Sequence, residues 1–511
     1  MKKILIAMIG GLFAFFGQAQ LVTDGDYRSM GMGGGFMFTI DDAALNTNPS
    51  LLGWQATNYE HKFAVNLEDF HFKSSVALAD YLLFDSLGVN INSDDVTILE
   101  PFEIAWEAFE SYDPNANIYF TYDTTVSRTT RAKFKEALLK NNTFKMRNTI
   151  LGATYSSDSW GTFSLNISNE TTFRSQLSEQ FADFMAYGKT ASYFDTLVLI
   201  DGTRVANEEA NYQNDILINA YYAYSTDDSL DFMDIVGGSR FEFIRTRNHS
   251  LGWGKELTVD KPDLHLFVGG NVNVIEGLQF LSLDGTGNGI SMANFGRGML
   301  EKSPFGNSGL GASISASATI LLKEKWMFSA GFNNLGAIRW KRRKRNTVGS
   351  YVTEGDNSQF ENYVYGVSRT EHFTDQIDEA NFFWYLNEFP QEDAAVMLPT
   401  ASTTYLGIRR NFGKHFALGL DVIQPLVKSA PGSLSETYVS FNYQLTFKKF
   451  SLFSGINNGL NGQAAMPMGI SFGSRTSKVE FGLSIADLLG YLDNNKTNNF
   501  SAGVGLTYRF Y

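Results

Sequence analysis

A glycine cluster and two adjacent aspartates near the N-terminus are the strongest candidates for binding a phosphate or a metal ion. Glycines occupy positions 31 and 33–35, and Asp41 and Asp42 follow them. A nucleotide-binding loop would need the GxGxxG spacing or the lysine of a P-loop, and the segment has neither. Adjacent carboxylates could offer oxygens to calcium, but no EF-hand spacing surrounds them. We therefore expect no cofactor and no metal here, and an isolated metal site stays as the alternative.

Catalytic residues show no motif either. The 6 histidines are scattered without metal-ligand spacing, and neither GxSxG nor HExxH occurs. The chain has 0 cysteines, which excludes disulfides, thiolate chemistry and cysteine-based zinc sites. We expect the protein not to be an enzyme, although a Ser/His/Asp triad assembled in space stays open.

The first 19 residues predict an export signal. Lys2 and Lys3 precede an apolar run over 4–16, and small residues at Gly17 and Ala19 suit a cleavage site. This run is too short to span a membrane as a helix, and no later stretch is long enough. The net charge of -13 makes nucleic acid an unlikely partner. The expected location is the outer membrane, reached by export.

Period-2 alternation predicts β-strands along most of the chain. In 437–447 every second residue is apolar or β-favouring, and the residues between are mostly polar. A β-sandwich would alternate as well, but Gly, Ser, Asn and Thr on the second face favour the wet lumen of a barrel. We predict an all-β fold, a single transmembrane antiparallel β-barrel of about 14 strands.

The strand count comes from alternating runs, of which one or two are merged. These runs are 61–69, 72–82, 145–156, 160–173, 213–225, 262–275, 308–322, 326–339, 401–412, 415–424, 435–448, 450–458, 466–474, 477–486 and 499–511. Insertions at 83–144 and 340–400 do not alternate and contain apolar residues at helical spacing. We interpret them as long, partly helical extracellular loops that form either a cap or a groove for a ligand.

The segment RSMGMGGGFMFTIDDAALNTNPSLLGW, residues 28–54, resembles the mature N-terminus of the FadL-like outer-membrane barrels, including the PorV-type proteins. Ser50 stands where the family pattern has alanine after Asn-Pro. The resemblance implies that residues 20–54 form a plug or hatch inside a barrel made by 55–511. Whether the segment only fills the lumen or acts as a gate is open. The candidate hatch residues are Gly31, Gly33, Gly34, Gly35, Asp41, Asp42, Asn46, Asn48 and Pro49.

Other segments are similar to a Bacteroidetes branch of these barrels, of unknown function. They are 264–274, 327–340, 398–425 and 481–492. The last segment, NFSAGVGLTYRFY, resembles the C-terminal strand that the barrel assembly machinery reads in outer-membrane proteins. The residues that would carry this signal are Tyr508, Phe510 and Tyr511.

A basic run follows one predicted strand and stands out in an acidic protein. At the outer rim it could pair with lipopolysaccharide phosphates through charge-assisted hydrogen bonds, and in the periplasm it would be a solvated turn. We favour the rim because a long loop follows. The residues are Arg339, Lys341, Arg342, Arg343, Lys344 and Arg345.

Two functions fit this fold. The first is transport of a hydrophobic or amphipathic small molecule through the barrel, with residues 21–54 as the hatch. The second is a PorV-like binding or scaffold barrel, which presents its loops to a secretion system or a cell-surface protein. Both would place the protein among outer-membrane lipid and lipopolysaccharide.

Overall fold

The computed structural model describes most of the strands and the N-terminal part of the lumen. The described residues are 26–58, 62–74, 132, 135–136, 138–139, 142–187, 191–199, 201–208, 220–224, 237–286, 289–295, 309–340, 347–350, 396–413, 415–434, 437–458, 465–473, 477–488 and 500–510. The predicted signal at 1–19, most of the insertions at 83–144 and 340–400, and Tyr511 lie outside these residues.

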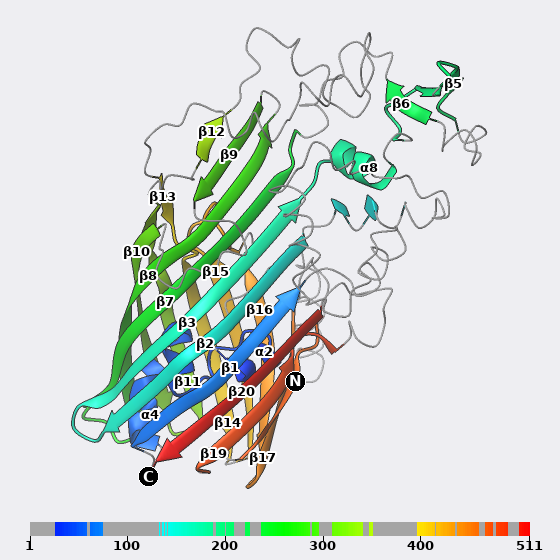
Figure 1. Ribbon diagram of the computed structural model, residues 1–511. Coiled ribbons are helices and arrows are strands. Elements are labelled where there is room, and N and C mark those ends of the chain that lie inside the picture. The colour runs from blue at the N-terminus through cyan, green and yellow to red at the C-terminus, as the bar shows by residue number, and fades with distance from the viewer. Residues whose placement is uncertain are drawn as a thin grey trace.

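A closed antiparallel barrel of fourteen strands forms the body of the molecule (Figure 1). Each strand pairs with the next around the wall, and β1 (Phe63–Ser74) pairs with β20 (Phe500–Phe510) to close the sheet. The strands between them are β2 (Asn142–Ser157), β3 (Gly161–Gln176), β7 (Arg240–Leu257), β8 (Leu264–Thr286), β10 (Gly309–Leu322), β11 (Trp326–Trp340), β14 (Thr403–Phe412), β15 (Phe416–Pro425), β16 (Tyr438–Thr446), β17 (Phe450–Asn457), β18 (Met468–Phe472) and β19 (Val479–Ile485).

Shorter elements lie above the barrel at one end. Three short strands continue the wall there, β9 (Gly289–Phe295), β12 (Thr347–Ser350) and β13 (Val396–Pro399). Helix α8 (Glu179–Tyr187) and a separate three-stranded sheet of β4 (Thr196–Leu199), β5 (Arg204–Ala206) and β6 (Ala220–Tyr224) follow β3. At the opposite end, turns such as those between β2 and β3 and between β10 and β11 are short. Short turns face the periplasm in outer-membrane barrels, so the long connections define the outer end.

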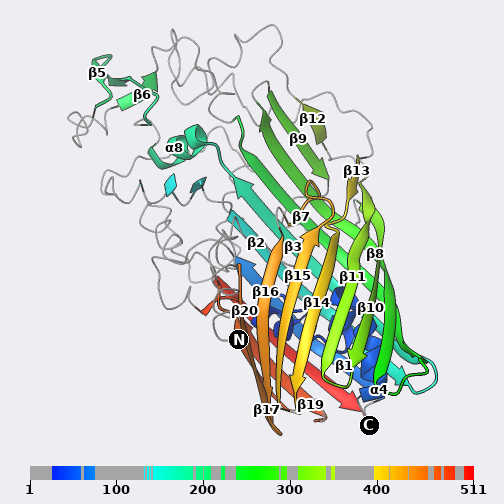
Figure 2. The same ribbon diagram turned by 180° about the vertical axis from the view of Figure 1, so that it is seen from behind.

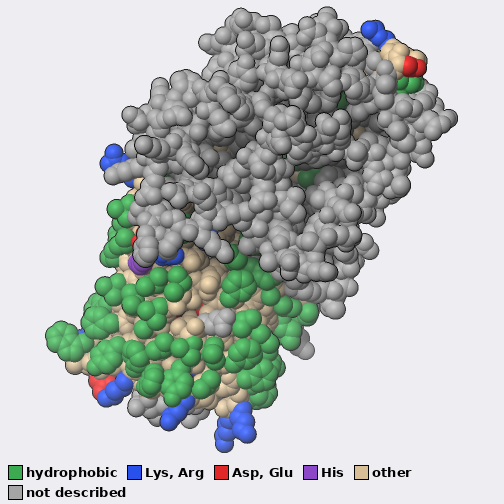
Figure 3. Space-filling model, in the orientation of Figure 1, with side chains coloured by type: hydrophobic (Ala, Val, Ile, Leu, Met, Phe, Trp, Pro, Cys, Tyr) green, Lys and Arg blue, Asp and Glu red, His purple; other side chains and the backbone are tan. Residues whose placement is uncertain are grey.

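The wall alternates as the sequence predicts. In β19, Glu480 and Ser484 are buried inside, while Val479, Phe481 and Leu483 are exposed outside. Apolar side chains gather in a band over the part of the wall nearest the short turns (Figure 3). A barrel with this outer face suits the hydrocarbon of a bilayer. Among the described residues, no helix is both long and apolar enough to cross a membrane.

The strand assignment needed one expected merging and two corrections. The described parts of the runs 61–69 and 72–82 form one strand, β1, in line with the expected merging, and residues 75–82 lie outside the described residues. The run 213–225 was wrongly placed in the wall, because its described part, β6, belongs to the separate sheet. Strand β7 was missed, since Arg245 and Arg247 occupy its outward register and break the apolar alternation. Two of these errors compensate, which is why the predicted number of strands is right.

Candidate functional site

Residues 26–58 lie inside the barrel, and we call them the plug (Figure 1). The plug contains helices α2 (Tyr27–Gly31), α3 (Asp42–Thr47) and α4 (Ser50–Asn58). Asp26 caps the N-terminus of α2, where its Oδ1 accepts the Ser29 backbone N–H at 2.9 Å. Pro49 precedes α4, and its fixed φ suits the start of a helix. All residues from 26 to 55 are buried, so the barrel encloses this segment.

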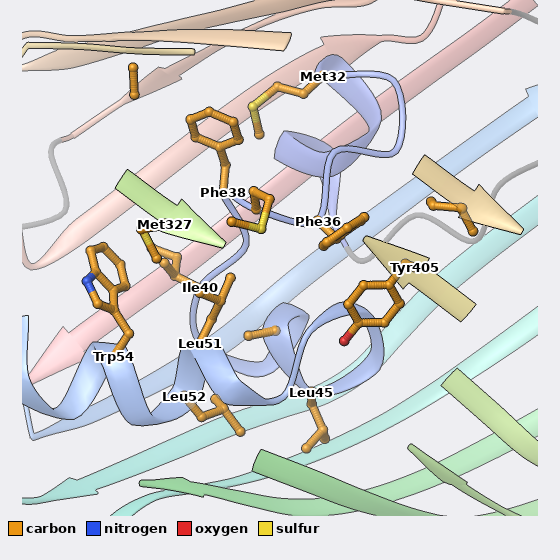
Figure 4. Close-up of a cluster of buried hydrophobic side chains, with 14 of the residues drawn as sticks. Met32, Phe36, Phe38, Ile40, Leu45, Leu51, Leu52, Trp54, Met327 and Tyr405 are labelled. Carbon is orange, nitrogen blue, oxygen red and sulfur yellow. The ribbon is translucent and has the colours of Figure 1, made fainter. Parts of the chain in front are cut away.

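The hydrophobic core of the protein lies between the plug and the wall (Figure 4). Phe36 packs on Tyr405 of β14 with ring centroids 4.3 Å apart, and the Arg409 guanidinium lies 4.4 Å from the centre of the Phe38 ring. The other plug side chains in this cluster are Tyr27, Met32, Met37, Ile40, Ala44, Leu45, Leu51, Leu52 and Trp54. Because these side chains are shielded from water, burial stabilises the plug inside the barrel.

A buried ion cluster joins the plug to the last two strands. Arg28 binds Glu480 of β19 with Nη2 to Oε1 at 2.8 Å. Arg509 of β20 binds Glu480 through Nη1 at 2.8 Å and Asp41 through Nη2 at 2.8 Å. Gln55 Nε2 donates to Asp41 Oδ1 at 2.8 Å. These side chains are almost fully buried, so removing one leaves its partner charged and unpaired in the interior.

Uncharged hydrogen bonds attach the middle of the plug to β10, β11 and β14. Asn48 Nδ2 donates to Ser329 Oγ at 2.9 Å, and the Tyr405 hydroxyl donates to Asn48 Oδ1 at 3.4 Å. The Ser50 backbone N–H donates to Ser317 Oγ at 2.8 Å, and the Ser50 and Thr319 hydroxyl oxygens are 2.6 Å apart. Seen from behind, the plug lies within this part of the wall (Figure 2).

Glycines allow the plug backbone to touch the wall. A Cβ on Gly269 of β8 would lie 2.2 Å from the Pro49 carbonyl oxygen. The Tyr27 ring lies against Gly482 and Gly505, where a Cβ would overlap it. Gly33 has a φ of +68°, which favours glycine, and its carbonyl accepts the Tyr438 hydroxyl. The wall glycines therefore shape the lumen to the plug.

The predicted hatch residues all lie in the plug and are buried. Asp42 Oδ2 accepts Asn166 Nδ2 of β3 at 2.7 Å, and Asn46 Oδ1 accepts the Ser250 hydroxyl of β7 at 3.1 Å. Asp41 faces Arg509 and Gln55 rather than other acids. No group of three or more potential metal ligands occurs among the described residues. Gly31 lies against Phe453, Gly35 lies against Asn442, and Gly34 has a φ of +79°.

Burial controls the charge of Asp42. Loss of hydration raises the pKa of its carboxyl to about 7, although the hydrogen bond from Asn166 lowers it. The negative charges of Asp69 and Asp41 also raise this pKa. A carboxyl with such a pKa is about half protonated at pH 7, whereas an ordinary aspartate is ionised there.

The other predicted sites lie on the outside of the wall. Phe510 is exposed on β20 beside Phe63, with ring centroids 5.5 Å apart, and Tyr508 is half-buried. Arg339 is exposed on the outer face of β11, near its outer end. The rest of the basic run, Lys341 to Arg345, lies outside the described residues.

Sequence reasoning missed several residues that hold the plug, both in the plug itself and in the wall. Tyr27, Arg28, Glu480, Arg509 and Arg409 carry much of the attachment, and none was a candidate. One signal was available, because Glu480 and Arg509 place charges in the inward register of strands that otherwise put small residues there. Their partners could not be inferred, since Arg28 and Glu480 are 452 residues apart.

A hollow lies beside the plug near the outer end, where Gly432 and Leu434 of the connection from β15 to β16 line it. The connection from β15 to β16 crosses part of this end, because Gly432 within it approaches Thr172 of β3. The lining combines apolar side chains with amides and hydroxyls, including Phe36, Asn46, Thr47, Asn333, Tyr405, Ile423 and Leu434.

The fold and its lumen define the class of the protein, a plugged membrane β-barrel of the outer-membrane type. A model of a family of unknown function (DUF5723) matches residues 81–483, and the chain belongs to that family. No curated protein matches the chain.

Solved structures of membrane channels cover most of the chain at low similarity. A TodX deltaS2S3 mutant monoaromatic hydrocarbon channel is 10% identical over 95% of this chain and 98% of that one, with a TM-score of 0.43. The P. putida toluene transporter TodX is 9% identical over 95% and 98%, with a TM-score of 0.39. A mutant Rh. blastica porin is 8% identical over 88% and 100%, with a TM-score of 0.23. Similarity at this level identifies no solute.

Proposed function

We propose that this protein is an outer-membrane channel for a hydrophobic or amphipathic small molecule, with the plug as its hatch. The hollow beside the plug is the observation that carries this proposal. It combines an apolar lining of Phe36, Tyr405 and Leu434 with the Asn46 and Asn333 amides. Small-molecule sites combine apolar walls with a few placed polar groups in this way.

The attachment of the plug supports a hatch. The strand ladder closes through β1 and β20 without any pairing to the plug. Side-chain hydrogen bonds, ion pairs and apolar packing hold the plug instead. Because the ladder does not depend on these contacts, weakening them should loosen the plug while the barrel stays folded.

The test is the Asp41→Ala/Asp42→Ala/Asn48→Ala variant. It should still migrate as a folded, heat-modifiable barrel and should make cells more sensitive to hydrophobic antibiotics. Thr57→Ala is the control, because Thr57 is an exposed plug residue that binds Glu256 at 2.8 Å. Loss of the folded form would assign the plug a structural role and contradict the hatch.

The completeness of plug burial favours a second candidate, a PorV-like scaffold for a secretion or cell-surface complex. Every residue from 26 to 55 is buried, as expected of a barrel that is sealed and presents its loops. A folded triple variant with unchanged permeability would support this candidate over transport.

Further assignments belong to the same proposal. Residues 1–19 direct export to the outer membrane, and the chain represents a Bacteroidetes branch of FadL-like barrels. Tyr508, Phe510 and Tyr511 signal to the assembly machinery. Arg339, which is exposed on the outer face, supports a lipopolysaccharide contact by the basic run that continues from it through Arg345.

A further inference from the structure

Attachment of the plug is uneven around the barrel. The described hydrogen bonds from the plug to the wall reach β7, β8, β10, β11, β14, β16, β19 and β20. On the first three strands, Asn166 of β3 donates to Asp42 of the plug. The inner faces of β1 and β2 therefore meet the plug differently from the rest of the wall.

Polar side chains with unpaired ends gather on that side. We call the inward residues Asp69 and His71 of β1, Thr149 of β2 and Ser168 of β3 the chamber, and each is at most 4% exposed. Both His71 ring nitrogens, the Thr149 and Ser168 hydroxyls and Asp69 Oδ1 make no hydrogen bond among the described residues. Asp69 Oδ1 lies 3.8 Å from His71 Nδ1, which is beyond hydrogen-bond distance.

Neighbouring strands place the chamber residues side by side. Thr149 pairs with Ser168 across β2 and β3, and Asp69 pairs with Thr149 across β1 and β2. Inward residues in register face the same space, so these side chains surround one region of the lumen. Buried polar groups are normally hydrogen-bonded, and a cluster of unpaired ones marks a place completed by water or by polar groups of a ligand.

Charges of both signs border the chamber. Lys145 Nζ binds Glu170 Oε1 at 2.8 Å, and Arg147 Nη2 lies 3.4 Å from Asn166 Oδ1. A hydrocarbon offers nothing to these groups, and burying them against one would cost free energy. A polar head group, or water that moves with it, can satisfy them.

We infer that the chamber is a hydrated path beside the plug, and that its solute is amphipathic, with a polar head group, rather than a pure hydrocarbon. That a solute uses this path rests on the proposed transport function. Hydration of the chamber does not depend on that function. The plug acts as a hatch on this side only: it stays attached to the opposite wall, and the head group passes along β1, β2 and β3.

The test uses the absence of cysteine from the chain. Ser168→Cys places one thiol in the chamber. Ser440→Cys is the matched control, because Ser440 is an equally buried inward serine that donates to the Met32 carbonyl at 3.0 Å. Both variants are first confirmed to be heat-modifiable barrels in proteoliposomes. They are then treated with a small, cationic methanethiosulfonate reagent, which needs water to reach the thiol.

Ser168→Cys should react faster than Ser440→Cys by an order of magnitude or more. Equal protection of the two thiols would overturn the inference. Influx of labelled norleucine, an amphipathic zwitterion, is measured in the same vesicles before and after modification. It should fall only when Ser168→Cys is modified. Fast labelling without any norleucine influx before modification would contradict an amphipathic solute, and toluene entry in the same vesicles would then show that transport itself stands.

Discussion

The two sides of the barrel lumen use the same residue types differently. On β10, β11 and β16, Ser317, Ser329 and Ser440 each bind a group of the plug. On β2 and β3, Thr149 and Ser168 are just as buried and bind no described group. We call β7 to β20 the anchoring wall and β1 to β3 the chamber wall.

The two walls show that inward polar residues of a barrel can have different roles. Alternation shows that a serine faces the lumen, but it does not show whether the serine holds a plug or borders water. The group that the serine contacts determines its role, and such groups come from distant parts of the chain. Matched substitutions on the two walls should therefore have different effects.

The largest effect should follow from removing the shared carboxylate of the ion cluster. Glu480→Ala leaves Arg28 and Arg509 buried with Asp26 and Asp41 as their remaining acids. Breaking a buried ion pair in this way costs about 3–5 kcal/mol. Urea unfolding of the purified barrel in micelles should show a loss of this size.

The matched change on the chamber wall is Asp69→Ala. Asp69 is equally buried, and its one described ion-pair partner is His71, a longer contact of 3.8 Å to a side chain that is charged only when protonated. Its loss should cost far less than the loss of Glu480. Equal losses for the two variants would contradict the distinction between the walls.

A smaller effect should follow from filling a glycine contact. Gly269→Ala puts a methyl group 2.2 Å from the Pro49 carbonyl oxygen, so the plug must shift. Overpacking of this kind costs about 1–3 kcal/mol. Sensitivity of cells to hydrophobic antibiotics should rise while the barrel stays heat-modifiable.

Gly270→Ala is the control for this change. The neighbouring glycine points outward, and a Cβ there would lie 3.2 Å from its nearest contact, the Ser315 carbonyl oxygen. It should leave permeability unchanged. If both alanine variants behaved alike, close plug contact at Gly269 would not restrict the lumen.

The fold was largely predictable from the sequence because a strand's period is local. Runs such as 435–448 and 499–511 show alternation within a dozen residues, and a bilayer outside with water inside imposes it. Strand β7 shows where this fails. Arg245 and Arg247 face outward near the outer end, so the lipid-facing pattern stops within the strand.

The site was less predictable because its contacts are long-range. Glycines and aspartates at 31–42 suggested a plug only through a family resemblance, and no local pattern names Arg509 as the partner of Asp41. The chamber was not predicted at all. His71, Thr149 and Ser168 are ordinary inward residues until their neighbours are known.

Plug docking should depend on pH through Asp42. Its pKa is about 7 when docked, above the ordinary 3.8. A raised pKa means that this stabilising contribution is fully present below about 3.8 and is lost as the pH rises through about 7. The urea midpoint should therefore be lower at pH 8.5 than at pH 5.5, roughly one unit or more either side of that pKa.

Asp42→Asn should reduce this dependence, because the amide stays neutral and can still accept from Asn166. Asp201→Asn, at an exposed loop residue, should keep it. An unchanged pH dependence in Asp42→Asn would show that another group titrates on docking.

The smallest effect should come from the chamber hydroxyls. Ser168→Ala removes a hydroxyl that has no described partner, so stability should change by less than about 0.5 kcal/mol. Ser329→Ala leaves the Asn48 amide without its acceptor and should cost about 1–3 kcal/mol. Thermal or urea unfolding would separate the two, and the reverse order would contradict the assignment of the walls.

We infer that solute passes beside a plug that stays on the anchoring wall. Ser50 and Thr319 can be joined to test it, because their hydroxyl oxygens are only 2.6 Å apart. Disulfide sulfurs lie about 2.0 Å apart, so Ser50→Cys/Thr319→Cys should oxidise readily and tie the plug to β10. Norleucine influx into proteoliposomes is then compared between the oxidised and the reduced protein. Passage beside an attached plug predicts equal influx in both states, whereas influx that appears only after reduction would contradict it.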